Sequence, residues 1–416
     1  MKLIVILLIT LMFAISVNAQ RTCGTVEYNS KNPLTVPEHF SGQTSRDTLS
    51  NEIINIPVVI HVIYKTSEQN ISDAQVLSQL VALNKDFSLK NIDAVNIPAA
   101  FRSLAADTRI NFCLARVDQN GRLTSGIVRK YTSLTYFNGD DAIKLSIKGG
   151  DDAWNSRQYL NIWVCKLFGR SLGYATSPGS PANLDGVVIN CDVFGTTDYV
   201  SPPFDKGRTA THEIGHWMGL KHIWGDQDCG NDDVDDTPTQ LSYNYNCPSF
   251  PRLSPCSPNA NGDMFMNFMD FTNDACMYMF TTGQKNKMRA AFANSGYRNS
   301  FLQSFACDST RAAAAGPLPE VPAASPVSKP SVITVSDEAV IIYPNPVNGI
   351  INIESNEKTI LTGSTARLYN VNGKLIKQLA LQSSGNKMNV QGISPGMYIL
   401  KVGDVGSKKI FKVVKL

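Results

Sequence analysis

The segment Thr211-His212-Glu213-Ile214-Gly215-His216-Trp217-Met218-Gly219-Leu220-Lys221-His222 contains three of the five histidines in the chain. Positions i and i+4 lie on one face of a helix, so His212 and His216 can present ring nitrogens to one metal ion. Gly219 lets the chain adopt positive φ and leave the helix, so that His222 can return as a third ligand. Three protein ligands leave one coordination position open, which is typical of a catalytic zinc site.

Glu213 directly follows the first of these histidines and points about a third of a turn away from it on a helix. From there it can take a proton from water, as the general base of metal-assisted hydrolysis. The alternative is an ordinary amphipathic helix with histidines on its polar face. The complete spacing H-E-x-x-H-x-x-G-x-x-H resembles the metzincin form of the zinc motif and favours the catalytic interpretation.

A methionine-rich segment, Met266-Asn267-Phe268-Met269-Asp270-Phe271, follows the histidines in the sequence. A metzincin carries a methionine turn downstream of its zinc motif, as a hydrophobic floor beneath the metal. We assign Met269 to that floor because of its place after the histidines. The alternative is plain hydrophobic core, for which methionine is well suited.

Four cysteines and an acidic run accompany these two motifs. They are followed by Phe280-Thr281-Thr282-Gly283-Gln284 and Arg289. Over roughly residues 50–305, this pattern resembles the pappalysin family of metzincin zinc endopeptidases. The resemblance implies two disulfide bonds, Cys229 with Cys256 and Cys247 with Cys276, whereas the sequence alone leaves three connectivities open.

The acidic run is Asp232-Asp233-Val234-Asp235-Asp236-Thr237. The family binds calcium here, so the resemblance implies a Ca²⁺ site with Asp232, the Val234 carbonyl and Thr237 as ligands. Oxygen ligands of these kinds suit a calcium ion. The alternative is a solvated turn without a metal.

Phe271 departs from the family pattern, in which the second residue after the turn methionine is usually a tyrosine. Phenylalanine has no hydroxyl to donate to the metal or to an oxyanion. This residue motivates a rival interpretation, a catalytically impaired binding or adhesion protein on a metzincin scaffold. The intact Glu213 favours an active endopeptidase that hydrolyses peptide bonds in protein or peptide substrates.

The composition indicates an ordinary globular protein of two or three units, with 416 residues, 43% of them hydrophobic and 18% charged. A formal net charge of +3 is too small to imply a nucleic acid or an anionic membrane as a partner. Residues 1–19 resemble a signal peptide cleaved after Ala19, and a retained membrane anchor is the alternative. We therefore expect an exported protein without stable membrane insertion, in a compartment where disulfides persist.

The nine cysteines are an odd number, so at least one thiol has no partner within the chain. Cys23 lies just after the predicted cleavage site, in a segment that we interpret as a propeptide, residues 20–45. A Cys23 thiolate could occupy the fourth zinc position and keep a zymogen inactive, as also occurs among pappalysin-like enzymes. The alternative is an exposed or disulfide-bonded cysteine. The partners of the remaining cysteines stay open: Cys113, Cys165, Cys191 and Cys307.

Some pappalysins cleave before basic residues, so the resemblance suggests a preference for Arg or Lys after the scissile bond. It makes the bond between Ser45 and Arg46 a candidate for autolysis. Asp274, after the methionine turn, is a candidate acidic pocket wall for such a basic side chain. The alternative is a surface aspartate without a role.

The pattern along the chain predicts an α/β catalytic domain over residues 46–307, with a twisted mixed sheet and the zinc helix in an upper subdomain. The Cys-rich region from about Trp224 to Phe305 lacks regular periodicity and is predicted to form an irregular lower subdomain. His61 is expected to be a packed strand residue rather than a ligand. Strands are predicted at 53–64, 109–115, 159–166 and 186–191, and helices at 72–86 and 208–219.

Residues 308–337 are rich in alanine and proline and indicate an extended linker. Residues 338–416 contain short apolar runs separated by turns and predict a small all-β sandwich. Tyr343-Pro344-Asn345-Pro346 and the segment from Ser394 to Tyr398 resemble the C-terminal sorting domain of type IX secretion. The resemblance implies the type IX secretion machinery as a partner and a secreted or cell-surface protein. A carbohydrate-binding or adhesive β-sandwich is the alternative.

Overall fold

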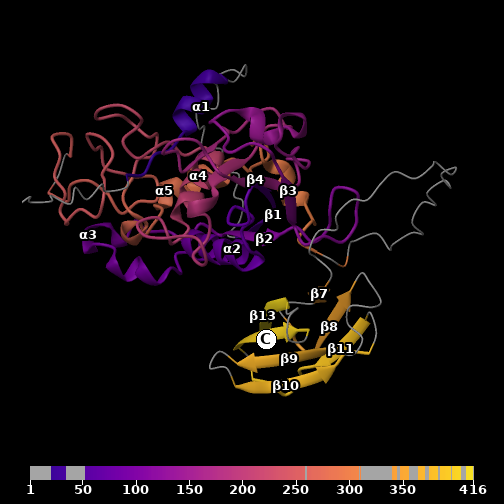
Figure 1. Cartoon of the computed structure of the whole chain (residues 1–416). Coiled ribbons are helices and arrows are strands. Elements are labelled where there is room, and N and C mark those ends of the chain that lie inside the picture. The colour runs from indigo at the N-terminus through magenta and orange to yellow at the C-terminus, as the bar shows by residue number, and fades with distance from the viewer. Residues whose placement is uncertain are drawn as a thin grey trace, which may run out of the picture. The chain divides into compact units, whose positions relative to one another are not determined.

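The computed structural model describes residues 20–33, 52–257, 260–308, 310, 340–343, 347–355, 364–370, 374–382, 385–394, 396–403 and 409–415 (Figure 1). The chain divides into two compact units, Met1–Pro319 and Glu320–Leu416, which we describe separately. Four predicted features lie wholly or mostly outside the described residues: the signal peptide at 1–19, the autolysis candidate at Arg46, the linker at 308–337 and the motif Tyr343-Pro344-Asn345-Pro346.

A six-stranded mixed sheet forms the framework of the first unit. β1 (Ile54–Tyr64) lies in its interior and pairs in parallel with β2 (Ile110–Leu114), β3 (Ile127–Tyr131) and β4 (Leu160–Cys165). β4 continues in parallel to β6 (Val187–Asn190), and β5 (Gly173–Ala175) is antiparallel to β6 at the edge of the sheet. β1 and β4 are almost entirely buried, as expected of strands covered on both faces.

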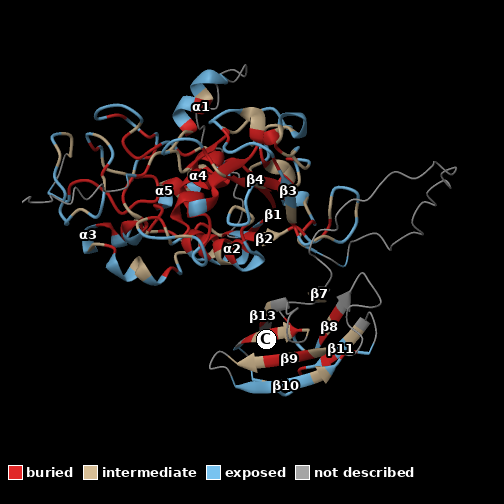
Figure 2. Ribbon diagram, viewed as in Figure 1, coloured by how far each residue is buried: buried red, intermediate tan, exposed pale blue. Residues whose placement is uncertain are grey.

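Two helices cover one face of this sheet. α2 (Asp73–Phe87) begins at Ser72, whose side chain accepts a hydrogen bond from the Gln75 N–H, and α4 (Arg208–Trp217) packs against it. Alternate side chains of β1, such as Ile56 and Val58, share one hydrophobic core with both helices. Figure 2 shows these strands and α4 as the buried interior of the unit.

The chain after α4 has little regular structure. Among the described residues from 218 to 281, the only helix is the short 3-10 helix η5 (Asp274–Cys276). α5 (Thr282–Ala290) follows, with a capping box formed by Thr281 and Gln284, and η6 (Asn299–Gln303) comes later. The irregular lower region therefore agrees with the sequence prediction, apart from α5.

Several short elements escaped the sequence analysis: α1 (Thr25–Lys31), β3 and β5 in the first unit and β11 (Gly385–Asn389) in the second. Their apolar patterns are too short to give a periodic signal. The other short helices of the first unit are η1 (Ile92–Asn96), α3 (Ala99–Arg102), η2 (Asp141–Lys144), η3 (Ser146–Lys148) and η4 (Cys191–Val193).

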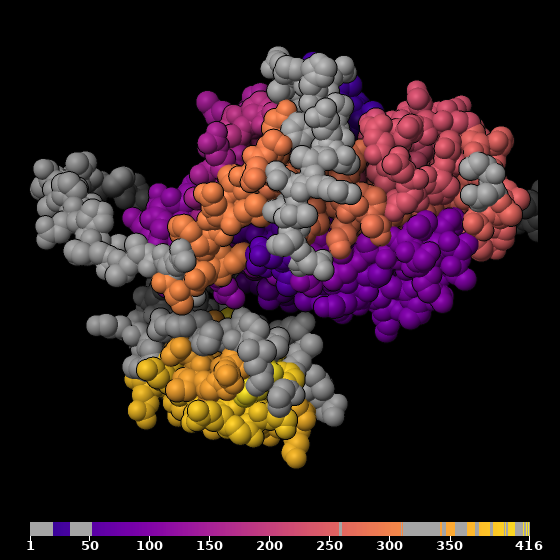
Figure 3. All heavy atoms as spheres, turned by 180° about the vertical axis from the view of Figure 1, so that it is seen from behind, coloured from indigo at the N-terminus to yellow at the C-terminus, as the bar shows by residue number. Residues whose placement is uncertain are grey.

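Three disulfide bonds join distant parts of the first unit. Cys229 pairs with Cys256 and Cys247 with Cys276, the two bonds that the family resemblance implies. The third, Cys113 with Cys307, fastens the end of this unit to β2, where the Arg116 N–H also donates to the Ala306 carbonyl at 2.7 Å. On the back of the unit, in Figure 3, the orange segment before residue 308 lies across the purple N-terminal half. The free cysteines are Cys23, Cys165 and Cys191.

The second unit consists of two antiparallel sheets. One contains β10 (Leu375–Ala380), β9 (Thr365–Asn370), β12 (Gly396–Val402) and β13 (Lys409–Lys415), and the other contains β11, β8 (Ile350–Ser355) and β7 (Val340–Tyr343). One buried cluster includes side chains from both sheets, such as Ile353 and Leu400. The C-terminal unit is thus all-β, with a core of its own. None of the described helices in the chain has the length and apolarity needed to cross a membrane.

Candidate metal centre

Helix α4 presents His212 and His216 from successive turns, as the spacing predicts. The helix ends because Gly219 adopts φ of +95°, and the Leu220 N–H then donates to the Gly215 carbonyl at 3.0 Å. This turn reverses the chain and brings His222 back beneath the helix. The three imidazoles are buried, with exposed fractions of 1%, 5% and 2%.

The three Nε2 atoms converge on one point. His216 Nε2 lies 3.2 Å from His212 Nε2 and 3.1 Å from His222 Nε2. Hydrogen bonds cannot explain why the Nε2 atoms lie so close together. Each ring carries its proton on Nδ1, so no Nε2 has a hydrogen to donate. Nδ1 of His212 donates to the Phe268 carbonyl at 2.7 Å and that of His216 to the Leu220 carbonyl at 2.8 Å.

Nδ1 of His222 in turn donates to the Asp226 carboxylate. All three Nε2 lone pairs are therefore free to face the same centre. Tetrahedral bonds of about 2.0–2.1 Å would place ligand nitrogens about 3.3 Å apart, so the donor set fits zinc.

The protonation state of the rings also suits metal binding. Burial lowers the pKa of His216 to about 3, and the neighbouring His222 adds to the effect. Burial, followed by the charges of the other two histidines, holds the pKa of His212 well below its ordinary value. Both rings are neutral at physiological pH, which is the form that binds a metal ion.

Met269 lies beneath α4. Its side chain is fully buried, and its sulfur lies 2.5 Å from the position that a Cβ on Gly215 would occupy. Glycine at that position therefore allows the methionine to approach the helix between the two histidine turns. The structure thus puts Met269 where the sequence analysis expects a floor.

Glu213 is 1% exposed and faces the N-terminal segment of the chain. Its Oε2 accepts a hydrogen bond from the Thr25 hydroxyl at 2.8 Å and lies 3.4 Å from Cys23 Sγ. Burial raises the pKa of Glu213 to about 7, against the hydrogen bonds from Thr25 and Cys23. A carboxyl group with a pKa near neutrality can both accept and return a proton.

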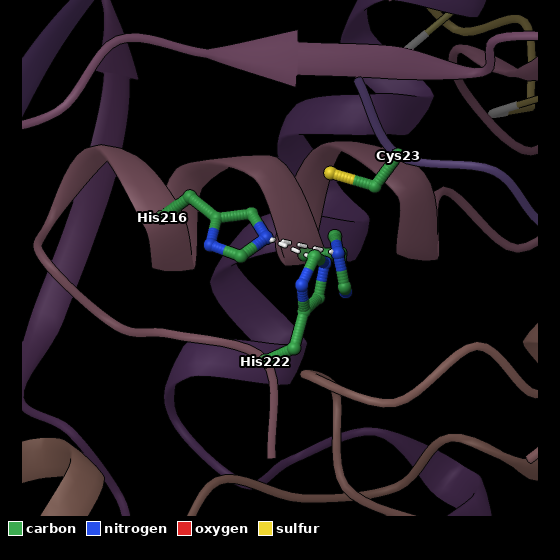
Figure 4. Close-up of side chains that lie close together, drawn as sticks. Cys23, His216 and His222 are labelled. Atoms are coloured by element: carbon green, nitrogen blue, oxygen red, sulfur yellow. Dashed lines mark hydrogen bonds between the residues drawn. The ribbon is translucent and has the colours of Figure 1, made fainter. Parts of the chain in front are cut away.

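Cys23 completes the cluster. Its Sγ and one nitrogen from each of His212, His216 and His222 all lie within 4.8 Å of one another. Figure 4 shows the sulfur pointing toward the imidazole rings from the segment that crosses above α4. One thiolate and three imidazoles form a complete tetrahedral donor set for zinc.

The segment that carries Cys23 pairs with β5 as a parallel strand. The Leu172 N–H donates to the Thr22 carbonyl at 3.1 Å, and the Gly24 N–H donates to the Gly173 carbonyl at 2.9 Å. The Ala175 N–H then donates to the Thr25 hydroxyl at 2.9 Å. The edge of β5 beside the histidines is thus occupied by residues 22–25.

Asp274 lies at the other end of this segment and is fully buried. It forms an ion pair with Arg21, whose Nη1 also donates to the Thr209 hydroxyl at 3.0 Å and whose Nε donates to the Thr272 carbonyl at 3.2 Å. The guanidinium group also lies 5.0 Å from the centre of the Phe204 ring. Asp274 is therefore a buried residue paired with a basic side chain, and does not lie on the surface.

The acidic loop brings the three predicted calcium ligands together. The Thr237 hydroxyl lies 2.9 and 3.0 Å from the carboxylate oxygens of Asp232 and 2.8 Å from the Val234 carbonyl. Burial raises the pKa of Asp232 to about 6. A buried carboxylate among neutral oxygens suits a cation.

Phe271 packs beside the histidines rather than away from them. Its ring centre lies 4.8 Å from that of His222 and 5.7 Å from that of His212, and Tyr243 stacks on it at 5.5 Å. The position that carries a tyrosine in the family is thus close to the metal centre here, without a hydroxyl.

The sequence analysis missed three residues of this site: Arg21, Thr25 and Asp226. Arg21 had a usable signal, since a basic residue two positions before Cys23 matches the expected preference for basic side chains. Asp226 comes four residues after His222, and outside a helix this spacing does not predict a contact between the two side chains. Thr25 had no signal. His61 is outside this group of donors and is a packed strand residue, hydrogen-bonded to Asp151 and Asn161.

Comparisons with protein families give two matches. Residues 146–293 match the family described as pregnancy-associated plasma protein-A, and residues 341–416 match the secretion system C-terminal sorting domain. An extracellular metalloprotease of Sordaria macrospora is 30% identical over 226 residues, which cover 48% of this chain and 75% of that protein.

Two solved structures resemble the first unit. Mature mirolysin of Tannerella forsythia, in complex with a cleaved peptide, is 50% identical with a TM-score of 0.59, covering 60% of this chain and 96% of its own. A variant of promirolysin from the same organism is 43% identical with a TM-score of 0.62, covering 68% of this chain and 97% of its own.

Proposed function

The chain belongs to the pappalysin family of metalloendopeptidases and carries a type IX secretion sorting domain, and from this we propose that it is a zinc endopeptidase made as a zymogen. It is a secreted protein. The observation that carries the proposal is the convergence of three imidazole Nε2 atoms, with spacings of 3.1 and 3.2 Å from His216, next to the buried Glu213.

A zinc ion held by His212, His216 and His222 would supply a Lewis acid for the scissile carbonyl and for water. Glu213 takes the proton of the attacking water and passes it to the leaving amine, so no covalent intermediate forms. Its buried environment and its pKa of about 7 suit both halves of this transfer. The substrate backbone would pair with the edge of β5, whose N–H and carbonyl groups residues 22–25 engage in this structure.

Latency follows from the same contacts. The Cys23 sulfur lies within 4.8 Å of the three imidazole nitrogens, which supports a role as the fourth ligand, and the Thr25 hydroxyl donates to Oε2 of Glu213 at 2.8 Å. The segment thus engages the metal ligands, the general base and the substrate edge at once. A zymogen in which residues 20–45 form the propeptide accounts for all three contacts.

A preference for Arg or Lys after the scissile bond follows from Arg21. Its buried guanidinium group fills the pocket walled by Asp274, so that pocket accepts a long cationic side chain. In the processed enzyme a substrate residue would take this place. The acidic loop would bind Ca²⁺ through Asp232, the Val234 carbonyl and Thr237 and stiffen this region.

The test is a comparison of the full chain with Glu213→Gln. The propeptide is removed from both proteins, either by self-cleavage or by an added protease. Both are then incubated with a peptide library with and without a zinc chelator. We expect chelator-sensitive cuts by the wild type and none by the variant, while metal analysis finds zinc in both. A processed, zinc-loaded wild type that cuts no peptide would establish the rival, a binding protein on this scaffold.

A further inference from the structure

Tyr28 anchors the N-terminal helix α1 at a place that the zinc chemistry does not use. The side chain is 3% exposed, although it comes from a helix of seven residues on the surface. Its hydroxyl donates to Asp141 at 2.5 Å and accepts from Lys144 Nζ at 2.9 Å. Its ring lies 4.9 Å from that of Tyr174. The phenol group is thus bound by hydrogen bonds at its oxygen and by aromatic packing at its ring.

The pocket lies on the opposite face of β5 from the metal centre. A Cβ on Gly173 would lie 3.0 Å from the Cγ atom of Glu213, so that residue faces α4 and the active site. Tyr174 is the next residue and points to the other face, where it shares a core with Tyr28 and Trp163. Residues 22–25 therefore lie along the edge of β5 on the side of the metal centre, which we call the cleft. Tyr28 binds on the opposite face of β5, which forms the rim of that cleft.

The chemistry of the pocket is specific for a phenol. Lys144 is fully buried among three aromatic rings, at 4.2 Å from the Tyr28 ring centre, 5.4 Å from Tyr174 and 5.9 Å from Trp163. The carboxylate that pairs with it is the partly exposed Asp141, at 3.3 Å. The hydroxyl of Tyr28 lies between the two, as acceptor for the ammonium and donor to the carboxylate. A phenylalanine would leave both groups without this partner.

Besides Tyr28 and Thr25, whose hydroxyl contacts Glu213 and the Ala175 N–H, the N-terminal helix also binds through Asn29. Asn29 Nδ2 donates to the Ala175 carbonyl at 3.4 Å, and the Ser177 N–H donates to Asn29 Oδ1 at 3.3 Å. These contacts are part-buried and longer than those of the Tyr28 hydroxyl. Tyr28 is the residue of α1 that is buried in the core on the face of β5 away from the metal centre.

We propose that the pocket formed by Lys144, Asp141 and Tyr174 is a phenol-binding site that holds the latency segment through Tyr28, independently of Cys23 and the metal. The proposal rests on the zymogen reading of residues 20–45. The ligand class is a tyrosyl side chain, and removal of the segment opens the site. Latency then has two anchors: residues 21–25 in the cleft and Tyr28 on the outer face of the rim.

The test measures attachment of the segment, not catalysis. In the full chain carrying Cys23→Ser, hydrogen–deuterium exchange of the peptide covering residues 20–32 reports how often the segment opens. We expect Tyr28→Phe to speed this exchange about tenfold and Tyr28→Ala about a hundredfold, since a hydrogen bond to a charged group and a buried ring are lost. Equal exchange in all three proteins would overturn the proposal.

A coupling experiment identifies the pocket. In Lys144→Met, Tyr28→Phe should have little further effect, whereas in the matched surface variant Lys148→Met it should keep its full effect. An undiminished effect of Tyr28→Phe in Lys144→Met would contradict the assigned pocket. Asp141→Asn serves the same purpose if Lys144→Met does not fold.

Chemical rescue tests the ligand class. Tyr28→Ala leaves a hole, and p-cresol, which is the tyrosine side chain alone, should slow the exchange of the segment in that variant. Toluene, which lacks the hydroxyl, should act more weakly. Equal rescue by both would show a plain apolar hole and overturn phenol recognition. None of these measurements needs peptidase activity, so a failed cleavage assay and a failed exchange result are distinguishable.

Discussion

Arg21 and Asp274 lie 253 residues apart in the sequence and form an ion pair in which the side chains are 1% and 0% exposed. Asp274 has two further partners, the N–H groups of Lys206 at 2.8 Å and Arg208 at 3.2 Å, both on Oδ2. The carboxylate is therefore fixed before any cation arrives. Its other oxygen, Oδ1, pairs with Arg21, which motivates a test of Asp274 as the wall of a specificity pocket.

Asp274→Asn should change specificity more than activity. In the processed enzyme we expect kcat/KM for a peptide with Arg after the scissile bond to fall about 100-fold, because a buried guanidinium group loses its counter-charge. For a peptide with Leu at that place, kcat/KM should stay within a fewfold. Asp228→Asn, an exposed carboxylate, is the control and should alter neither value. Equal losses on both peptides would indicate damage to the fold rather than to a specificity pocket.

Cys23→Ala should weaken latency in the full chain. The variant lacks the thiol that lies within 4.8 Å of the three imidazole nitrogens, so it should cleave a reporter peptide with a shorter lag and an initial rate at least about tenfold higher. Arg21 and Tyr28 remain, so the segment should still protect in part. Cys191→Ala, a buried free thiol, should keep the wild-type lag. An unchanged lag in Cys23→Ala would remove Cys23 from the latency mechanism.

Calcium should stabilise the protein through Asp232. We expect added Ca²⁺ to raise the melting temperature of the wild type by several degrees, because a bound ion at about 100 times its Kd contributes about 2.7 kcal/mol. Asp232→Ala should abolish that response. Asp233→Ala is the matched control in the same loop, since its exposed carboxylate pairs with Lys221 at 2.8 Å. If both variants respond to Ca²⁺ like the wild type, the loop is a turn without a metal.

The strands and helices with long apolar patterns were predictable. The ranges 53–64 and 72–86 match β1 and α2 within a residue or two, because each carries enough side chains to display its period. β5 has only three residues, and its place at the sheet edge depends on pairing with β6, which no local pattern encodes. α1 has no strong signal either, since its fixed position depends on Tyr28 reaching Lys144.

The metal centre was predictable because its ligands are local in sequence. The distances among His212, His216 and His222 follow from one helix turn and one glycine. The contacts of Arg21 with Asp274 and of Thr25 with Glu213 join residues 253 and 188 positions apart, so no local pattern encodes them. The family preference and the basic residue before Cys23 were each readable from the sequence, but their pairing was not.

Phe271→Tyr should raise turnover. The ring lies 4.8 Å from that of His222, so a hydroxyl on it would come close to the metal centre, where one added donor is worth up to about 100-fold in rate. We expect kcat to rise and KM to stay nearly constant, as for a contact made mainly in the transition state. Phe271→Leu controls for packing and should lower stability without raising kcat. A tyrosine variant with unchanged kcat would show that this enzyme family member needs no such donor.

Lys144 should make the stability of the full chain depend on pH. Burial lowers the pKa of Lys144 to about 8 in the folded protein, against its ordinary value of 10.5. Below about pH 8, Lys144 is protonated in both the folded and the unfolded protein, so the full cost of burying the ammonium group lowers the free energy of unfolding. Between the two values the unfolded chain still holds the proton while the folded protein has released it, so stability rises with pH.

The expected size is up to about 3 kcal/mol for a shift of this magnitude, or a few degrees in melting temperature. We therefore compare full-length wild type with Lys144→Met by scanning calorimetry from about pH 7 to about pH 10. The wild type should gain relative to the variant as pH rises. Lys148→Met, which alters an exposed lysine four residues later, should show a constant difference from the wild type. A constant difference for Lys144→Met as well would mean that Lys144 keeps its charge in the pocket, held there by Asp141 and the Tyr28 hydroxyl.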